Sequence, residues 1–273
     1  MSQFGRVWQY VAGGVTFNGL AARRLPHHFP NSAFAARYWK MTFDGANKFP
    51  EQLERLISVV EGDRVDSSDP QLVPGDEPMQ RLAGLLDKYG SDKDVNGYTA
   101  TYAGLLETLI GKGSGVRLLE IGLGSNTPGA ISGMGKEGRP GASLRAFRDF
   151  DEGIVCYGAD VDRLALFNEE RIKTAWVDQL EPESLSALDG ILGESTWDLI
   201  IDDGLHSPAA NLNVLIFGLE RISQDGFIVI EDIPVRALPV WTLVRRLLAI
   251  KAWTVHLIDT EHSTLAVIFR EAS

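Results

Sequence analysis

The sequence of 273 residues contains a single cysteine, Cys156, which lies in the apolar run 153–157. One thiol supports neither a disulfide framework nor a zinc site built from thiolates. Because free cysteine is among the side chains most often buried in protein cores, we predict that Cys156 is a buried core residue.

The sequence also lacks long apolar runs and an excess of positive charge. No stretch approaches the roughly 18 apolar residues of a membrane span, and residues 1–20 lack the uninterrupted apolar segment of a signal peptide. The formal net charge is −11 at pH 7, and the isoelectric point is about 4.9. Nucleic-acid phosphates and anionic membrane surfaces bind clustered Lys and Arg, so neither is expected as a partner. The sequence predicts a cytoplasmic protein without a membrane span that acts on a small or neutral molecule.

The character of the sequence changes at residues 61–78, which are acidic, rich in Pro, Gly and Ser, and without an apolar period. Such a composition is typical of a linker or a surface loop. Residues 1–60 combine aromatic side chains with Arg and His, and residues 50–57 fit one amphipathic helix. We therefore predict a mainly helical N-terminal appendage with its linker at 1–80 and a larger domain at 81–273. The appendage either covers an active site, makes a homo-oligomer contact or simply packs against the larger domain.

Short apolar segments alternate with helical patterns from residue 80 onward, as in an α/β protein. The predicted strands are 116–121, 154–159, 173–177, 197–201, 226–231, 252–258 and 264–269, and the predicted helices lie near 98–111, 142–150, 208–222 and 237–250. The last two apolar runs are separated by too few residues for a crossover helix, so they should pair antiparallel. We expect a mostly parallel, seven-stranded sheet that ends in an antiparallel C-terminal hairpin, unlike a plain dinucleotide-binding fold.

Two acidic pairs each follow an apolar strand of this pattern: Asp202-Asp203 and Glu231-Asp232. The carboxyl ends of parallel strands meet at one edge of the sheet, where open α/β sheets bind ligands. His206 follows the first pair closely in sequence. The pattern predicts a hard-cation site beside a candidate base. Taken singly, each acidic pair could equally be a helix cap or a solvated loop end.

A glycine turn, Glu120-Ile121-Gly122-Leu123-Gly124, ends the first predicted strand. Glycine lets the backbone approach a ligand closely. In a dinucleotide fingerprint the turn would run directly into a helix, whereas here a loop precedes Ser143, which can cap the next helix. We therefore favour a binding loop for another nucleoside over a pyrophosphate cradle. Asp160, at the end of the second strand, occupies the position that commonly binds ribose hydroxyls; NAD enzymes share this device, and an aspartate here can also cap a helix.

Seven segments carry a family resemblance: 89–93, 119–124, 141–145, 157–160, 177–179, 201–206 and 230–232. In order and spacing they resemble the successive motifs of class I S-adenosylmethionine-dependent O-methyltransferases. The most similar subgroup is the magnesium-dependent sugar methyltransferases of macrolide tailoring and polysaccharide biosynthesis. The resemblance covers about residues 85–235, leaves residues 1–80 uncovered, and implies a Rossmann-like methyltransferase fold.

The resemblance implies a role for each matched residue. The implied cofactor-binding residues are Glu120, Gly122, Gly124, Ser143, Asp160, Asp178, Gln179 and Asp202, the last of which either contacts the cofactor or orients its neighbours. The implied Mg²⁺ ligands are Asp203, Glu231 and Asp232, and the implied catalytic residues are Asp203 and the general base His206. Many relatives carry a histidine ahead of the tyrosine after the 89–93 motif, whereas this chain has Val95-Asn96-Gly97-Tyr98. The expected substrate-side residues are Tyr98 and Tyr102.

These groups suit methyl transfer to a hydroxyl. A sugar hydroxyl is a poor nucleophile at neutral pH, and in-line transfer from a sulfonium needs proton removal and fixed geometry. A divalent cation lowers the pKa of a bound hydroxyl, and a histidine can accept its proton. The resemblance thus implies an S-adenosylmethionine- and Mg²⁺-dependent O-methyltransferase acting on a sugar, an oligosaccharide or a glycosylated small molecule. The alternatives are an NAD(P)-linked oxidoreductase and a non-catalytic scaffold that binds S-adenosylmethionine.

Overall fold

The computed structural model describes residues 74–127, 134, 138–260 and 263–270. The predicted helix at 50–57 and most of the predicted appendage lie outside the described residues, and the domain boundary at residue 80 stays a prediction. Helix α5 (Asp76–Tyr89) begins within the stretch that composition assigned to a linker. Its first turn is acidic and contains a proline, which suits a helix start because carboxylates favour the positive end of the helix dipole and the first N–H groups have no partner within the helix.

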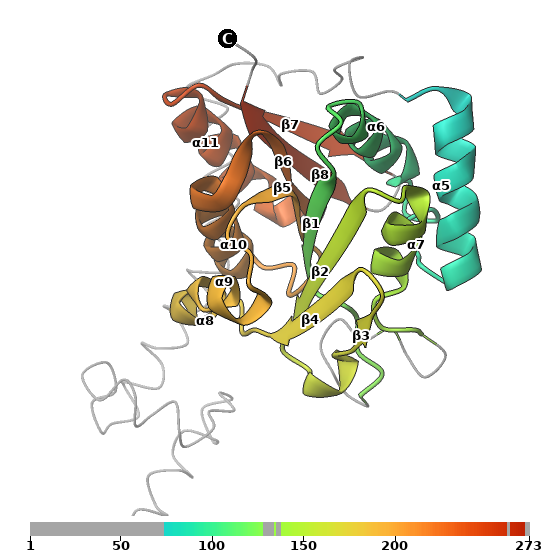
Figure 1. Ribbon diagram of the computed structural model, residues 1–273. Coiled ribbons are helices and arrows are strands. Elements are labelled where there is room, and N and C mark those ends of the chain that lie inside the picture. Colours follow the sequence, from blue (N-terminus) through green and yellow to red (C-terminus); the bar gives the residue numbers. More distant parts are fainter. Residues whose placement is uncertain (1–73, 128–133, 135–137, 261–262, 271–273) are drawn as a thin grey trace, which may run out of the picture. The chain divides into compact units, whose positions relative to one another are not determined.

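The described chain forms an eight-stranded sheet of order β3-β4-β2-β1-β5-β6-β8-β7 (Figure 1). Its strands are β1 (Val116–Ile121), β2 (Ile154–Asp160), β3 (Asn168–Glu169), β4 (Ile172–Trp176), β5 (Trp197–Asp202), β6 (Ile222–Ile233), β7 (Trp253–Asp259) and β8 (Thr264–Arg270). Neighbouring strands from β4 to β6 pair parallel, and β8 pairs antiparallel with both β6 and β7. The predicted mostly parallel sheet with an antiparallel C-terminal hairpin is confirmed.

Helices cover both faces of this sheet (Figure 1). One face carries α5, α6 (Thr99–Ile110) and α7 (Ala142–Phe150), and the other carries α8 (Pro182–Ser186), α9 (Leu188–Leu192), α10 (Pro208–Arg221) and α11 (Leu238–Ala249). Leu118 and Leu119 of β1 are both fully buried, one in each of the two apolar clusters. Strands buried on both faces read as continuous apolar runs, which is why the central strands were predictable. Cys156 is fully buried, as predicted, and burial raises the pKa of its thiol.

The structure also contains elements that the sequence pattern did not predict. Strand β3 has only two residues and pairs antiparallel with β4, while α8 and α9 have five residues each. Elements this short cannot display an apolar period. Strand β6 begins earlier than predicted, at Ile222. The sequence pattern did not indicate this start because most of the first residues of the strand are polar and partly exposed. None of the described helices has the length and apolar composition needed to cross a membrane.

The sheet reverses its strand order between β1 and β5. Strand β2 lies on one side of β1, and β5 lies on the other side. The connection that leaves β1 therefore runs toward β2 and the one that leaves β5 runs toward β6, and the two diverge to leave a crevice. Ligands of open α/β sheets bind at such a switch point. The topology therefore places the glycine turn after β1 and the acidic ends of β5 and β6 around one crevice.

Candidate active site

The carboxyl ends of β1 and β5 are in direct backbone contact. Ile121 pairs with Asp202 in the parallel register, and the Asp203 N–H donates to the Ile121 carbonyl at 2.8 Å. Gly122 follows with a φ of 97°, and a Cβ atom there would lie 2.0 Å from the Asp203 carbonyl oxygen. Glycine is required for two reasons, because the backbone contact leaves no room and because this φ disfavours a side chain. The glycine turn and the predicted metal aspartate therefore form one unit.

We expect Gly122→Ala to weaken S-adenosylhomocysteine binding at least tenfold and to destabilise the fold by about 2 kcal/mol. The added methyl group would have to displace backbone atoms rather than a flexible side chain. Calorimetric titration and thermal unfolding measure the two effects. Gly84→Ala in α5 is the matched control, since its Cβ position is open and alanine favours helix, so that variant should be at least as stable as the wild type. A Gly122→Ala protein with wild-type stability and affinity would contradict the close approach.

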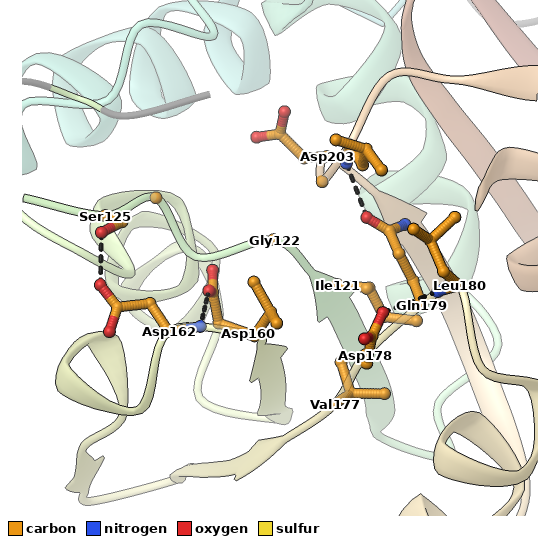
Figure 2. Close-up of a pocket in the computed structure, with 14 residues that line it drawn as sticks. Ile121, Gly122, Ser125, Asp160, Asp162, Val177, Asp178, Gln179, Leu180 and Asp203 are labelled. Atoms are coloured by element: carbon orange, nitrogen blue, oxygen red, sulfur yellow. Dashed lines mark hydrogen bonds between the residues drawn. The ribbon is translucent and has the colours of Figure 1, made fainter. Parts of the chain in front are cut away.

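A cavity of about 330 Å³ lies beside the glycine turn (Figure 2). Six of the predicted site residues line it: Gly122, Gly124, Asp160, Asp178, Gln179 and Asp203. They follow four different strands, so the topology brings together residues that are distant in sequence. The cavity also has apolar walls that include Val177 and Leu205. Apolar walls with a few convergent polar groups are the usual lining of a small-molecule site and suit a nucleoside.

Asp160 braces the glycine turn as well as lining this cavity. Its Oδ2 accepts a hydrogen bond from the Leu123 N–H, and its Oδ1 accepts one from the Asp162 N–H, both at 2.7 Å. Burial raises the pKa of this carboxyl against the lowering effect of the hydrogen bonds. Each carboxylate oxygen keeps a further lone pair, so Asp160 can still accept hydrogen bonds from ribose hydroxyls.

Three residues of the two loops beside this cavity were missed by sequence reasoning. The hydroxyl groups of Ser125 and Thr127 both donate to Asp162 Oδ2, that of Thr127 at 2.5 Å. These hydrogen bonds lower the pKa of Asp162. Figure 2 shows how Ser125 and Asp162 connect the loop after β1 with the loop after β2. Only the polar character of both loops could have indicated this contact, and polar loops are too common to single it out.

Asp202 is fully buried and lines neither this cavity nor the second one described below. Its Oδ1 accepts from Gln179 Nε2 at 2.9 Å, and its Oδ2 accepts from Asn211 Nδ2 at 2.8 Å. Gln179 Oε1 in turn accepts from the Leu205 N–H at 2.6 Å. Of the two roles considered for Asp202, the geometry favours orientation of the loop that follows β5.

A second cavity, of about 250 Å³, shares Gly122, Gly124 and Asp203 with the first. Its lining also includes Lys93, Met134, Ser143, His206 and Asp232. Glu120 lies beneath it, fully buried, and accepts a hydrogen bond from Ser143 Oγ at 2.6 Å. Most of the predicted cofactor, metal and base residues therefore line two cavities that meet at the glycine turn; Glu120, Asp202 and Glu231 line neither.

A buried lysine lies among the carboxylates at this edge. Lys93 Nζ donates to Asp203 Oδ2 at 2.6 Å and to the two carboxylate oxygens of Glu231 at 2.7 and 2.8 Å. The same nitrogen lies 3.3 Å from Glu120 Oε1. Burial alone would lower the pKa of Lys93, but the three carboxylates raise it well above its ordinary value, so the side chain carries a positive charge.

Burial acts on the carboxylates in the opposite direction. It raises the pKa of Glu120 to about 6, against the lowering effect of Lys93, and it raises the pKa of Glu231 well above its ordinary value. The buried negative charge at this edge therefore exceeds what one lysine neutralises, and a divalent cation would relieve the remainder. Sequence analysis included Lys93 in a matched motif without a role, since lysine is rarely buried.

Tyr98 and Tyr102 have a setting other than the expected substrate-facing one. Both are fully buried, and neither lines either cavity. The Tyr98 hydroxyl donates to Asp232 Oδ1 and is hydrogen bonded to Ser263 Oγ at 2.6 Å. The Tyr102 hydroxyl donates to Glu231 Oε1. Burial, together with these acidic neighbours, raises the pKa of both phenols, so they remain protonated donors.

Two carboxylate oxygens at the second cavity accept no hydrogen bond from the described residues: Asp203 Oδ1 and Asp232 Oδ2. His206 Nε2 lies 4.0 Å from the first and 3.6 Å from the second, and the three residues offer ligand atoms within 4.8 Å of one another. Carboxylate oxygens are the ligands that Mg²⁺ prefers, so this donor set fits the implied metal. Glu231, the third predicted ligand, directs both oxygens toward Lys93.

His206 and Asp232 have positive φ angles of 29° and 51°. For residues other than glycine such backbone conformations cost roughly 1–3 kcal/mol each and persist where the surrounding structure imposes them. His206 Nδ1 is buried and has no hydrogen-bond partner among the described residues. Four described residues other than glycine have positive φ angles, and two of them are thus the candidate base and one candidate ligand; the other two are Arg171 and Ala252.

Comparison with solved structures identifies the fold. Two crystal structures of MycE methyltransferase from the mycinamycin biosynthetic pathway, one in complex with Mg and SAH and one with Mg, SAH and mycinamycin VI, match with TM-scores of 0.52 and 0.53. The identities are 23% and 22%, and the matches cover 69% and 70% of this chain and 54% and 53% of the solved chains. The chain has the Rossmann-like fold of the class I S-adenosylmethionine-dependent methyltransferases.

Sequence comparison finds similarity to O-methyltransferases. The chain is 32% identical over 196 residues to 8-demethyl-8-alpha-L-rhamnosyl tetracenomycin-C 2'-O-methyltransferase of Streptomyces olivaceus, which covers 71% of this chain and 44% of that protein. It is 31% identical over 118 residues to demethylmacrocin O-methyltransferase of Streptomyces fradiae, covering 43% and 27% respectively. The chain thus spans less than half the length of the curated relatives it matches, and no protein-family model matches it. The resemblance to S-adenosylmethionine-dependent O-methyltransferases is confirmed.

Proposed function

We propose that the protein is an S-adenosylmethionine- and Mg²⁺-dependent O-methyltransferase that methylates a hydroxyl of a sugar, an oligosaccharide or a glycosylated small molecule. The observation that carries this proposal is the pair of cavities that meet at Gly122, Gly124 and Asp203. One is lined for a nucleoside, and the other holds a candidate base beside two free carboxylate oxygens. The curated relatives, whose names describe O-methylation of glycosylated natural products, support the same reading.

The first cavity accounts for cofactor binding in this proposal. Asp160 accepts hydrogen bonds from the ribose hydroxyls, and Asp178 and Gln179 lie toward the adenine. Gly122, Gly124, Ser143 and Glu120 would hold the methionine part of the cofactor. The two cavities share Gly122 and Gly124, so a cofactor bound there would supply its methyl group on the side of the site that holds His206.

The second cavity accounts for activation of the acceptor. Asp203 and Asp232 would hold the cation through their free oxygens, while Glu231, the third predicted ligand, directs both oxygens toward Lys93. When bound, Mg²⁺ supplies Lewis-acid chemistry that lowers the pKa of an acceptor hydroxyl and fixes its orientation. His206 Nε2, which faces both free carboxylate oxygens, accepts the proton of that hydroxyl. The deprotonated acceptor oxygen would take the methyl group from bound S-adenosylmethionine, with the bond from carbon to sulfur breaking and S-adenosylhomocysteine leaving.

The acceptor, the cellular location and the assembly belong to the proposal as well. The acceptor is a small molecule or a saccharide, as in the MycE complex with mycinamycin VI. We expect the enzyme to work in the cytoplasm, and a homo-oligomer contact through residues 1–80 stays a prediction.

Calorimetric titration with S-adenosylhomocysteine, with NAD titrated in parallel, tests the cofactor class. We expect saturable binding of S-adenosylhomocysteine alone, followed by methyl transfer to a glycosylated acceptor in a screen with and without Mg²⁺. Binding of NAD alone would replace the proposal with the oxidoreductase alternative. Binding of S-adenosylhomocysteine and Mg²⁺ without turnover of any acceptor would favour the non-catalytic scaffold.

A further inference from the structure

Three side chains of residues 93–102 contact the acidic strand ends from inside the protein. Lys93, Tyr98 and Tyr102 are each at most 1% exposed, and each donates to a carboxylate that sequence analysis assigned to the metal. Tyr98 and Tyr102 line neither cavity, so they do not face an acceptor, and the Lys93 ammonium is directed at the carboxylates. Their geometry therefore bears on how the carboxylates are held.

The two tyrosines lie on one face of the start of α6. Tyr98 is the N-cap residue, and Tyr102 follows one turn later, so both side chains point the same way. They reach Asp232 and Glu231, which are consecutive in β6. Consecutive side chains of a regular strand point to opposite faces, so one helix face would not meet both.

A local irregularity of β6 resolves this conflict. The pairing of β6 with β8 shifts its register between Ile230 and Ile233, and Asp232 within that interval has a φ of 51°. Such a bulge re-aims a side chain and is common beside active sites. The strained backbone at Asp232 is what allows both carboxylates to receive a hydrogen bond from α6.

The donors also determine which oxygens remain free. Asp203 Oδ2 accepts a hydrogen bond from Lys93. Asp232 Oδ1 accepts one from Tyr98 and a second from Ser263 Oγ, which lies at 3.0 Å. The other oxygen of each aspartate faces His206 Nε2. One oxygen of each aspartate therefore accepts hydrogen bonds from the protein interior, and the other oxygen points into the second cavity.

We propose that Lys93, Tyr98 and Tyr102 are positioning residues for the divalent cation. Their hydrogen bonds fix the rotation of the carboxylates. The Lys93 ammonium occupies the position among Glu120, Asp203 and Glu231, called here the inner position, so that the metal binds on the cavity side. The inference rests on the proposed function for the presence of a cation. It gives the two tyrosines a role in metal binding instead of acceptor binding.

Titration of the full chain with Mn²⁺, followed by the electron paramagnetic resonance signal of free Mn²⁺, tests the tyrosines. Loss of an outer hydrogen-bond partner typically weakens metal binding about 10- to 100-fold, and we expect this for Tyr98→Phe and for Tyr102→Phe. Tyr89→Phe is the matched control, because its hydroxyl also donates to a carboxylate, that of Asp149, on the surface between α5 and α7. Tyr89→Phe should bind Mn²⁺ as the wild type does.

The outcomes separate this inference from the proposed function. Wild-type Mn²⁺ affinity in Tyr98→Phe and Tyr102→Phe would overturn the inference and leave the metal site of the proposed function intact. Equal weakening in Tyr89→Phe would trace the effect to general loss of structure and would also overturn it. Absence of Mn²⁺ binding by the wild type would overturn both.

Lys93→Met tests the inner position with the same titration. Glu120, Asp203 and Glu231 offer ligand atoms within 4.8 Å of one another, and Lys93 Nζ lies within 3.3 Å of a carboxylate oxygen of each. We expect one bound Mn²⁺ per wild-type chain and a second in the variant. A variant that binds one Mn²⁺ with unchanged or tighter affinity would mean that lysine and metal compete for one position, which contradicts the inference. If the variant does not fold, the tyrosine variants decide.

Discussion

Asp203→Asn is expected to lower kcat for methyl transfer on the order of 10³-fold or more while S-adenosylhomocysteine still binds. The aspartate contributes to both halves of the site, since Oδ2 receives Lys93 and Oδ1 faces the second cavity. A neutral amide loses most of its attraction for a divalent cation, and a metal supplies several kcal/mol of stabilisation to developing charge. Steady-state rates with the acceptor found in the screen, together with Mn²⁺ titration, measure the effect.

Asp198→Asn is the matched control for this substitution. Asp198 lies in the same strand, β5, but its carboxylate pairs with Arg117 at 3.0 Å, outside both cavities. The control variant should be less stable than the wild type while its kcat is unchanged. If Asp203→Asn retained both Mn²⁺ binding and more than a tenth of the wild-type rate, the carboxylate could not be a principal metal ligand.

His206→Ala is expected to lower kcat about 10²- to 10⁴-fold, the usual contribution of a general base. A base that is not a metal ligand predicts a specific pattern: the rate falls, the affinities for S-adenosylhomocysteine and Mn²⁺ persist, and added imidazole restores part of the rate. Rates measured from pH 6 to about pH 10 should rise more steeply in the variant, because hydroxide then takes over proton removal.

His256→Ala gives the corresponding control, since His256 packs against the Phe269 ring on the β7–β8 hairpin with a centroid separation of 5.1 Å. Its removal should leave kcat unchanged. Full activity of His206→Ala in excess chelator would rule out the mechanism. Loss of Mn²⁺ binding in His206→Ala would instead make His206 a ligand, consistent with its place beside Asp203 and Asp232.

The sheet could be predicted from the sequence because its central strands are buried on both faces. Segments such as 116–121 and 197–201 carry apolar side chains on both faces, which leaves few alternatives, and the short gap before 264–269 required an antiparallel hairpin. The two-residue strand β3 and the five-residue helices could not be predicted, because their conformation depends on contacts with β4 and α10 rather than on a local pattern.

The candidate site was predictable where function requires an unusual residue in a fixed place. Gly122 and Asp203 stand at strand ends, so topology alone brings them together. Lys93 was not predictable, because its partners lie 110 and 138 residues further along the chain and no local feature distinguishes a buried lysine from a solvated one. Tyr98 and Tyr102 were assigned to the substrate side from the family resemblance that follows the 89–93 motif, but both side chains are fully buried.

The backbone contact between Gly122 and Asp203 has a thermodynamic consequence. A cofactor that fixes the conformation of the glycine turn also fixes the position of the carbonyl group of Asp203, the predicted metal aspartate, since neither backbone segment can shift without the other. Binding of the nucleoside and binding of the cation are then linked equilibria, and each must change the affinity of the other by the same factor. Under the proposed function, the metal affinity of the protein would depend on the concentration of the methyl donor.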